Sequence, residues 1–151
     1  MPDSAVLERS AVTAPRLHPM YRRVLLHLAH GLQRLDIAEL EGLRRGTADL
    51  RIENLYAQLG ADSAATAVIA GHGLGLLPRE EFATPRLTGE QAGLLKLVGS
   101  GLRNRVIADE LGLTLGTAAL RVGSLYRATR AVNRPNCCHI GFCTGFLGGG
   151  A

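Results

Sequence analysis

Apolar residues recur at spacings of three and four along most of the chain, which is the spacing of amphipathic helices. In the C-terminal half, the first apolar group is Leu94, Leu95 and Val98. Two further groups follow: Val106, Ile107 and Leu111, then Ala118, Val122, Leu125 and Tyr126. A fourth apolar segment covers residues 135–147. No segment alternates as a half-buried strand does, so the pattern predicts an all-α protein.

Turn and capping residues separate these predicted helices. Gly99 and Gly101 follow the first apolar group, where glycine favours the left-handed conformation that ends a helix. Gly112 supplies a turn after the second group. Thr114 comes next, and its hydroxyl oxygen suits the unpaired amides at the start of a third helix. The sequence therefore predicts a short helix, a tight turn and a capped longer helix.

The chain contains an internal repeat at an offset of 70 residues. Without gaps, 19 of 61 positions are identical between residues 17–77, which we call repeat one, and residues 87–147, which we call repeat two. The identical pairs are mainly turn glycines and spaced apolar residues, among them Gly31/Gly101, Ile37/Ile107, Ala38/Ala108, Gly42/Gly112, Leu50/Leu120, Arg51/Arg121, Leu55/Leu125 and Tyr56/Tyr126. We expect one helical unit from each repeat.

The remaining residues fall outside the repeats. Residues 1–16 are predicted to be a flexible N-terminal arm, residues 78–86 (PREEFATPR) a linker, and residues 148–151 a frayed tail.

Repeat two carries the motifs LTGEQ, GLRNRVIA and LGLTLGTA, followed by an arginine. The residues that carry the pattern are Leu87, Thr88, Gly101, Leu102, Asn104, Ile107, Ala108, Leu111, Thr117, Leu125, Tyr126 and Arg134. The segment thereby resembles the C-terminal DNA-binding domain of LuxR/FixJ-type regulators, and repeat one resembles it more loosely. The resemblance implies two tandem four-helix, LuxR-like helix-turn-helix units, in which the third helix reads the major groove of DNA and the fourth commonly dimerises.

This resemblance implies double-stranded DNA as the partner. Two units in one chain could mimic a dimer on half-sites one helical turn, ~34 Å, apart. Alternatively, the fourth helices could pair two chains as a homodimer.

Both repeats depart from the family after the threonine of the third helix. The family usually has Val and Lys there, whereas repeat two has Ala118 and Ala119 and repeat one has Ala48 and Asp49. DNA phosphates would repel an aspartate at this position unless it accepted a hydrogen bond from cytosine.

The second helix also differs between the repeats. Repeat one keeps the family's acidic residue as Asp36, which is Val106 in repeat two. Glu41 takes the place of Leu111, a predicted core residue, so either the packing differs there or Leu40 substitutes.

Charge separates the repeats as well. Repeat one has six arginines and six acidic residues, whereas repeat two has seven cations and three acidic residues. Because neutralised phosphates supply most non-specific affinity, we expect repeat two to be the main DNA contact and repeat one to be a dimerisation or docking module.

Candidate DNA contacts follow from these positions. Arg103, Asn104 and Arg105 begin the second helix, where they suit backbone phosphates. Arg121 is the candidate for reading a guanine, and Ala118 and Ala119 for approaching a thymine methyl. The other candidates are Thr117 and Arg127 in repeat two, and Arg44, Arg45 and Arg51 in repeat one.

Composition excludes several classes of protein. The chain has no run of eighteen apolar residues and no hydrophobic stretch behind a basic N-terminus, so we expect neither a membrane span nor a signal peptide, and a cytoplasmic location. Aromatic residues make up only 4%, which disfavours stacking on single-stranded nucleic acid. Sixteen of the seventeen cations are arginines, which suit phosphate and guanine.

The C-terminal cluster Cys137, Cys138, His139 and Cys143 invites a zinc site. Adjacent cysteines chelate poorly, and the repeat places Cys137 and Cys138 opposite Ala67 and Val68, so we predict small core residues and no metal or cofactor. The histidines His18, His27, His30 and His72 show no catalytic spacing and are expected at the surface or in the core. No catalytic motif is present, so we expect no enzyme.

These inferences together predict a sequence-specific, double-stranded DNA-binding transcriptional regulator. The alternative is a regulator whose degenerate helix-turn-helix units bind RNA polymerase, a sigma factor or another transcription factor.

Overall fold

The computed structural model describes residues 16–148, which form eight α-helices and no strand. The all-α prediction is confirmed. The predicted arm and tail lie outside the described residues, except for Arg16 and Gly148. Repeat one contains α2 (Pro19–Ala29), α3 (Arg34–Leu40), α4 (Arg45–Leu59) and α5 (Ala64–Gly73). Repeat two contains α6 (Gly89–Gly99), α7 (Asn104–Leu111), α8 (Leu115–Thr129) and α9 (Arg134–Cys143).

The predicted turn and cap between α7 and α8 are confirmed. Gly112 ends α7 in the left-handed conformation with φ 66°. The Thr114 hydroxyl then accepts a hydrogen bond of 3.1 Å from the amide of Thr117. Local chemistry therefore sets the sharp change of direction between the two helices.

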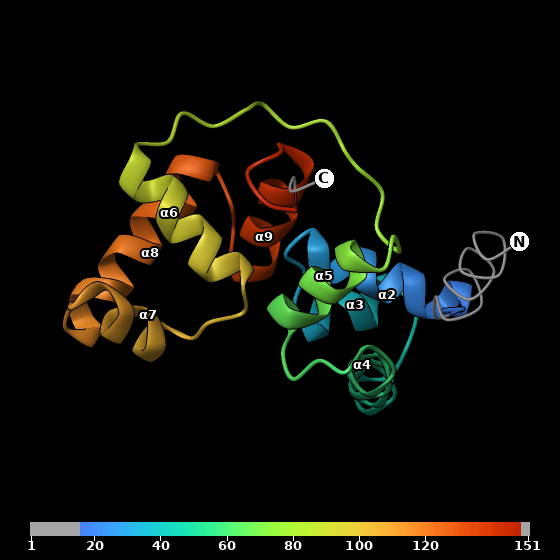
Figure 1. Cartoon of the computed structure of the whole chain (residues 1–151). Helices are drawn as coiled ribbons and strands as arrows, with labels where there is room; N and C mark the ends of the chain where they lie inside the picture. The colour runs from blue at the N-terminus through green and yellow to red at the C-terminus, as the bar shows by residue number, and fades with distance from the viewer. Residues whose placement is uncertain (1–15, 149–151) are drawn as a thin grey trace, which may run out of the picture.

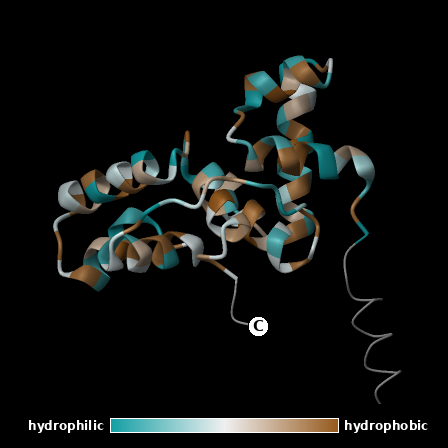
Figure 2. Ribbon diagram, turned by 90° about the horizontal axis from the view of Figure 1, so that it is seen from above, coloured by the Kyte–Doolittle hydropathy of each residue, from teal (hydrophilic) through white to brown (hydrophobic). Residues whose placement is uncertain are grey.

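The arrangement of the helices brings the repeats together. The chain between α5 and α6 arches along one edge of the molecule, and α9 lies between the other helices of repeat two and those of repeat one (Figure 1). Hydrophobic and hydrophilic residues are interspersed along each helix, as amphipathic packing requires (Figure 2). None of the helices within residues 16–148 combines the length and the apolar character that crossing a membrane needs.

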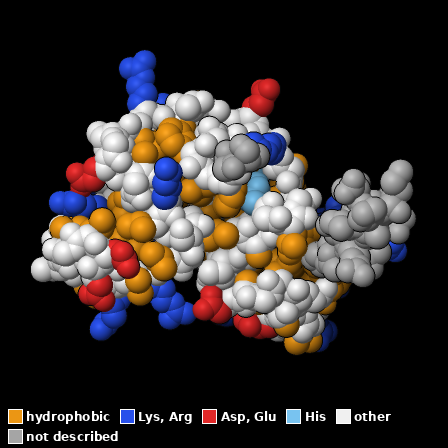
Figure 3. All heavy atoms as spheres, in the orientation of Figure 1, with side chains coloured by type: hydrophobic (Ala, Val, Ile, Leu, Met, Phe, Trp, Pro, Cys, Tyr) orange, Lys and Arg blue, Asp and Glu red, His pale blue; other side chains and the backbone are white. Residues whose placement is uncertain are grey.

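Several apolar residues lie at the surface, where both halves show hydrophobic side chains (Figure 3). The prediction that Leu111 belongs to the core is wrong, because its side chain is 42% exposed. Ile107 and Ala108 supply the buried face of α7, and Leu111 lies at the helix end beside a shallow groove. Val106 is exposed as well.

The corresponding position in repeat one also differs from the expectation. Leu40 does not substitute for a core leucine, because it is 62% exposed. The Glu41 carboxylate instead accepts hydrogen bonds from Arg23 Nε at 3.1 Å and pairs with His27 Nε2 at 3.0 Å. These two contacts lower the pKa of Glu41, His27 contributing most, against the opposing effect of burial.

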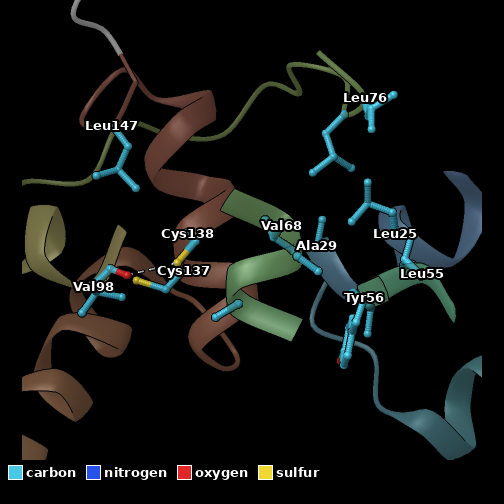
Figure 4. Close-up of a cluster of buried hydrophobic side chains, with 14 of the residues drawn as sticks. Leu25, Ala29, Leu55, Tyr56, Val68, Leu76, Val98, Cys137, Cys138 and Leu147 are labelled. Carbon is cyan, nitrogen blue, oxygen red and sulfur yellow. Dashed lines mark hydrogen bonds between the residues drawn. The ribbon is translucent and has the colours of Figure 1, made fainter. Parts of the chain in front are cut away.

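The two repeats share one hydrophobic core. Helix α9 packs against α5 and α2 of repeat one as well as against α6 and α8. Val68 and Ala29 belong to the same buried cluster as Val98, Cys137 and Cys138 (Figure 4). Both cysteines are fully buried, which confirms them as core residues. The C-terminal segment of repeat two is therefore the centre of the molecule.

Polar contacts fix the joint between the repeats. Asn136 donates from Nδ2 to the carbonyl of Ala29 at 3.0 Å, and Asn133 donates to the carbonyl of Gly31 at 2.9 Å. Ala29 is the last residue of α2 and Gly31 follows its C-cap, so both carbonyls lie where the helix offers them no partner. The joint thus combines apolar packing with directional hydrogen bonds.

Candidate nucleic-acid interface

The exposed side of α8 and the start of α7 form the candidate interface in repeat two. Helix α8 buries Ala118, Val122 and Leu125 on its inner side and leaves Ala119 and Arg121 exposed. Arg103 and Arg105 are exposed at the start of α7. In Figure 3, cationic side chains project from the lower edge of the half that contains these helices. The outer side of α8 and the start of α7 therefore both carry exposed guanidinium groups.

One predicted contact is wrong. Ala118 has no exposed surface, because it lies on the buried side of α8, and it cannot reach a base. The neighbouring Thr117 is half-buried, and its hydroxyl accepts a hydrogen bond from the Thr114 hydroxyl at 2.9 Å. The accessible part of this helix turn is Ala119.

Two of the predicted DNA-binding arginines form exposed ion pairs. Arg121 Nη1 binds Glu90, at the start of α6. Arg103 Nη2 lies 3.3 Å from Asp62 of repeat one. Exposed pairs of this kind contribute only about 0–1 kcal/mol, so a phosphate or a base can displace the carboxylates.

Asn104 takes part in a structural contact. Arg134, at the start of α9, donates to the Leu102 carbonyl at 3.0 Å and also to Oδ1 of Asn104. These bonds join the start of α7 to the start of α9. The Asn104 carbonyl oxygen is therefore already paired inside the protein.

The equivalent surface of repeat one has a different charge pattern. Arg34, at the start of α3, donates to Glu53 at 2.7 Å and to Asp49 at 3.3 Å. The hydrogen bond that Arg34 donates to Glu53 is the main cause of its raised pKa. This arginine offsets the negative charge of α4, whereas Arg44 and Arg45 are exposed beside it.

The predicted fourth helices, α5 and α9, pack against each other within one chain. Helix α4 and the α7–α8 pair lie on opposite sides of this joint (Figure 1). A homodimer through the fourth helices would have to separate α5 from α9.

A second polar cluster lies at the joint, and the sequence analysis missed it. It contains His30, His72, Glu80, His139 and Cys143, which come from the end of α2, from α5, from the linker and from α9. His72 Nε2 lies 2.8 Å from His139 Nδ1, and His30 Nε2 lies 2.7 Å from a Glu80 oxygen. Only the spacing of four between His139 and Cys143 is visible in the sequence.

Burial controls the ionisation of this cluster. It lowers the pKa of His72 to about 4, with further contributions from the charges of His139 and Arg79. It lowers the pKa of His139 as well, although Glu80 opposes this shift. Burial would raise the pKa of Glu80, but the hydrogen bond and the charge of His30 prevail and lower it.

Compared with known protein families, curated proteins and solved structures, the chain shows no match. Its function must therefore be argued from its own residues.

Proposed function

We propose that this protein is a cytoplasmic, double-stranded DNA-binding transcriptional regulator built from two tandem LuxR-like helix-turn-helix units. The observation that carries the proposal is the surface of α8. This helix buries its inner face, leaves Ala119 and Arg121 exposed, and lies beside the exposed Arg103 and Arg105 of α7. A capped helix with small residues and an arginine on its outer side suits the major groove.

The joint between the repeats supports a regulator that needs no second chain. In the LuxR/FixJ family, the fourth helices commonly join two chains. Here α5 and α9, the two fourth helices, pack against each other within one chain. Repeat one then serves mainly as the docking unit that holds repeat two, because Asp49 and Glu53 make its own third helix less attractive to phosphate.

A binding titration against random duplex DNA at several salt concentrations tests the proposal. We expect a steep fall of affinity with salt, and Arg105→Ala should reduce the slope by about one. Arg86→Ala, an exposed linker arginine, is the matched control and should leave the slope almost unchanged. A wild-type protein with no salt dependence would contradict DNA binding.

A second titration tests sequence reading by Arg121. DNA fragments selected from a genomic library by the wild-type protein should bind Arg121→Ala roughly 5- to 150-fold more weakly, which corresponds to ~1–3 kcal/mol. Arg51→Ala, at the same position of repeat one, should cost much less. Equal losses for the two variants would refute the assigned division between the repeats.

One observation favours the alternative of a protein partner. Leu50 and Leu120 occupy the same repeat position and are 60% and 74% exposed. Single exposed leucines are ordinary, but a repeated one on the outer side of both third helices suits a protein groove. Under this alternative, Leu120→Ala abolishes binding to purified RNA polymerase holoenzyme, whereas Arg121→Ala leaves DNA affinity unaffected.

A further inference from the structure

We propose that the joint between the repeats contains a binding site for a divalent transition-metal ion such as Zn²⁺, with His72, His139 and Cys143 as its ligands. The three side chains come from both repeats, because His72 lies on α5 and the other two lie on α9. A bound ion would tie the repeats together. This proposal does not depend on DNA binding.

The ligand atoms are already close together. His72 Nε2 lies 2.8 Å from His139 Nδ1, Cys143 Sγ lies 3.7 Å from the same nitrogen, and all three atoms are within 4.8 Å of one another. Zinc bonds of ~2.05 Å to nitrogen and ~2.3 Å to sulfur place tetrahedral ligands about 3.3 Å (N to N) and about 3.6 Å (N to S) apart. The two histidines need to separate by only about 0.5 Å to admit the ion.

One side chain must reorient. Cys143 Sγ lies 3.7 and 3.8 Å from the two ring nitrogens of His139, so it lies off the lone-pair axis of Nδ1. Placing the sulfur on that axis requires rotation about the Cα–Cβ bond of Cys143, which gives up the hydrogen bond of 3.4 Å that the sulfur accepts from the Glu80 amide. His139 and Cys143 are four residues apart on α9 and therefore share one face of the helix. The metal displaces the thiol proton as it binds.

The other ring nitrogen of His139 has a suitable partner. Glu80 Oε2 lies 3.5 Å from His139 Nε2, and His30 contacts the same carboxylate. Histidine ligands commonly donate their second N–H to a carboxylate, which fixes the ring and makes it a better ligand. Glu80 is thus a positioning residue, and His139 offers its Nδ1 to the metal.

The surroundings allow an ion to enter and exclude most water. His139 is fully buried, whereas His72 and Cys143 are half-buried. Histidine atoms reach the surface near the middle of the face seen in Figure 3. Phe142 stacks on His72 at a centroid distance of 4.5 Å, and Phe82 meets the ring of His139 edge-on at 5.7 Å. This apolar shell favours a compact site with three protein ligands and one position for water.

The chemistry of the set also selects the ion. Two imidazoles and a thiolate suit Zn²⁺, whereas Mg²⁺ requires oxygen ligands. Cys137 and Cys138 are not part of the set, because both are buried in the core, and burial raises the pKa of the Cys138 thiol to about 12.

Titration of the full chain, first freed of metal with a chelator, tests the site with Co²⁺ as a spectroscopic probe. We expect one Co²⁺ per chain and a thiolate-to-cobalt charge-transfer band. Cys143→Ser should lose the band, and His72→Gln should weaken binding at least tenfold. Glu80→Gln should keep the band but weaken binding about 10- to 100-fold. His18→Gln, which changes an exposed histidine outside the cluster, should bind as the wild type does.

Zn²⁺ provides an independent readout through thermal unfolding. It should raise the melting temperature of the wild type and of His18→Gln, but not that of Cys143→Ser, and Mg²⁺ should have no effect. Far-UV circular dichroism verifies that each variant is folded before titration. Absence of the cobalt band in the wild type overturns the proposal, as does a band that persists in Cys143→Ser.

Discussion

Repeat one and repeat two place different chemistry at equivalent positions of the same helical arrangement. Where repeat two has the exposed Leu111, repeat one has Glu41 bonded to Arg23 and His27. Where repeat two has Ala119, repeat one has Asp49 bonded to Arg34. The acidic residues of α4 are thus paired with Arg34 of the same repeat, whereas α8 has no acidic residue and its Arg127 is exposed.

The residues at the helix ends also differ between the repeats. Asp36 accepts a hydrogen bond from the Gln33 amide at the start of α3, and Gly60 ends α4 with φ 65°. At the equivalent positions, repeat two has the exposed Val106 and has Arg130 in the left-handed conformation with φ 61°. At the start of the second helix and the end of the third, repeat two therefore lacks the favourable residue that repeat one has, whereas at the start of the third helix it has the Thr114 cap where repeat one has Arg44 without a side-chain cap.

The largest expected difference between the repeats concerns Gly31 and Gly101. Both have φ 85°, but a Cβ atom on Gly31 would lie 2.2 Å from Val132, whereas on Gly101 the nearest atom is 3.4 Å away on Thr66. Gly31→Ala should lower the free energy of unfolding by about 3 kcal/mol and Gly101→Ala by about 1 kcal/mol. Urea denaturation measures the free energy of unfolding of both variants. Equal losses would show that contact with Val132 does not exclude a side chain at Gly31.

Glu41 should make the stability of repeat one depend on pH. Its pKa in the folded protein is below its ordinary value of 4.5, so its contribution is fully present above that value and is lost as the pH falls through the folded pKa. Glu41→Gln should cost about 1–2 kcal/mol at pH 7, and this cost should shrink as the pH falls below the ordinary pKa of 4.5 and through the lower folded pKa. The control Glu39→Gln changes an exposed acid of α3, two residues before Glu41, and should show neither effect.

Replacing Arg130, the C-cap of α8, by the glycine that repeat one has at this position should stabilise the protein. Arg130→Gly removes the left-handed strain of a residue with a Cβ and should raise the free energy of unfolding by about 0.5–1 kcal/mol. Arg130→Ala removes the charge but keeps the Cβ atom, so it should not stabilise the protein. Thermal denaturation of the two variants side by side distinguishes strain from charge.

The smallest expected effect concerns the ion pair between Glu90 and Arg121. Releasing Arg121 with Glu90→Gln should increase affinity for duplex DNA by up to about fivefold, because an exposed pair is worth at most about 1 kcal/mol. Glu81→Gln removes an exposed linker charge and controls for net charge. The gain should disappear in the double variant Glu90→Gln/Arg121→Ala. A gain that survives there would mean that Glu90 acts through general repulsion.

Local features of the fold could be predicted from the sequence because neighbouring residues determine them. Gly112 and Thr114 end one helix and begin the next through their own backbone and side-chain chemistry. The burial of individual side chains could not be predicted in this way, because it depends on how the helices pack together. Helical periodicity assigned Leu111 to the inner face, but the end of α7 does not reach the core.

In the candidate site as well, contacts between distant segments could not be predicted from the sequence. Periodicity put Ala118 on the same face as Val122 and Leu125, and that face is buried; the wrong expectation of a base contact came from its position directly after Thr117. The pairing of α5 with α9 required knowledge of how two repeats meet, since either repeat alone predicts only that its fourth segment packs back. The histidine cluster draws on four separate segments, so the sequence shows the spacing of His139 and Cys143 but not that His30, His72 and Glu80 lie beside them.

The hydrogen bonds that Asn133 and Asn136 make to repeat one span 102 and 107 residues of sequence. Contacts of such long range cannot form until α9 has been synthesised, because α9 follows all of repeat one in the chain. Until α9 is available, the surfaces of α2 and α5 that pack against it remain uncovered. During synthesis, this interval is when the protein is most exposed to aggregation and to chaperones, and a truncated chain that lacks α9 would remain in that state.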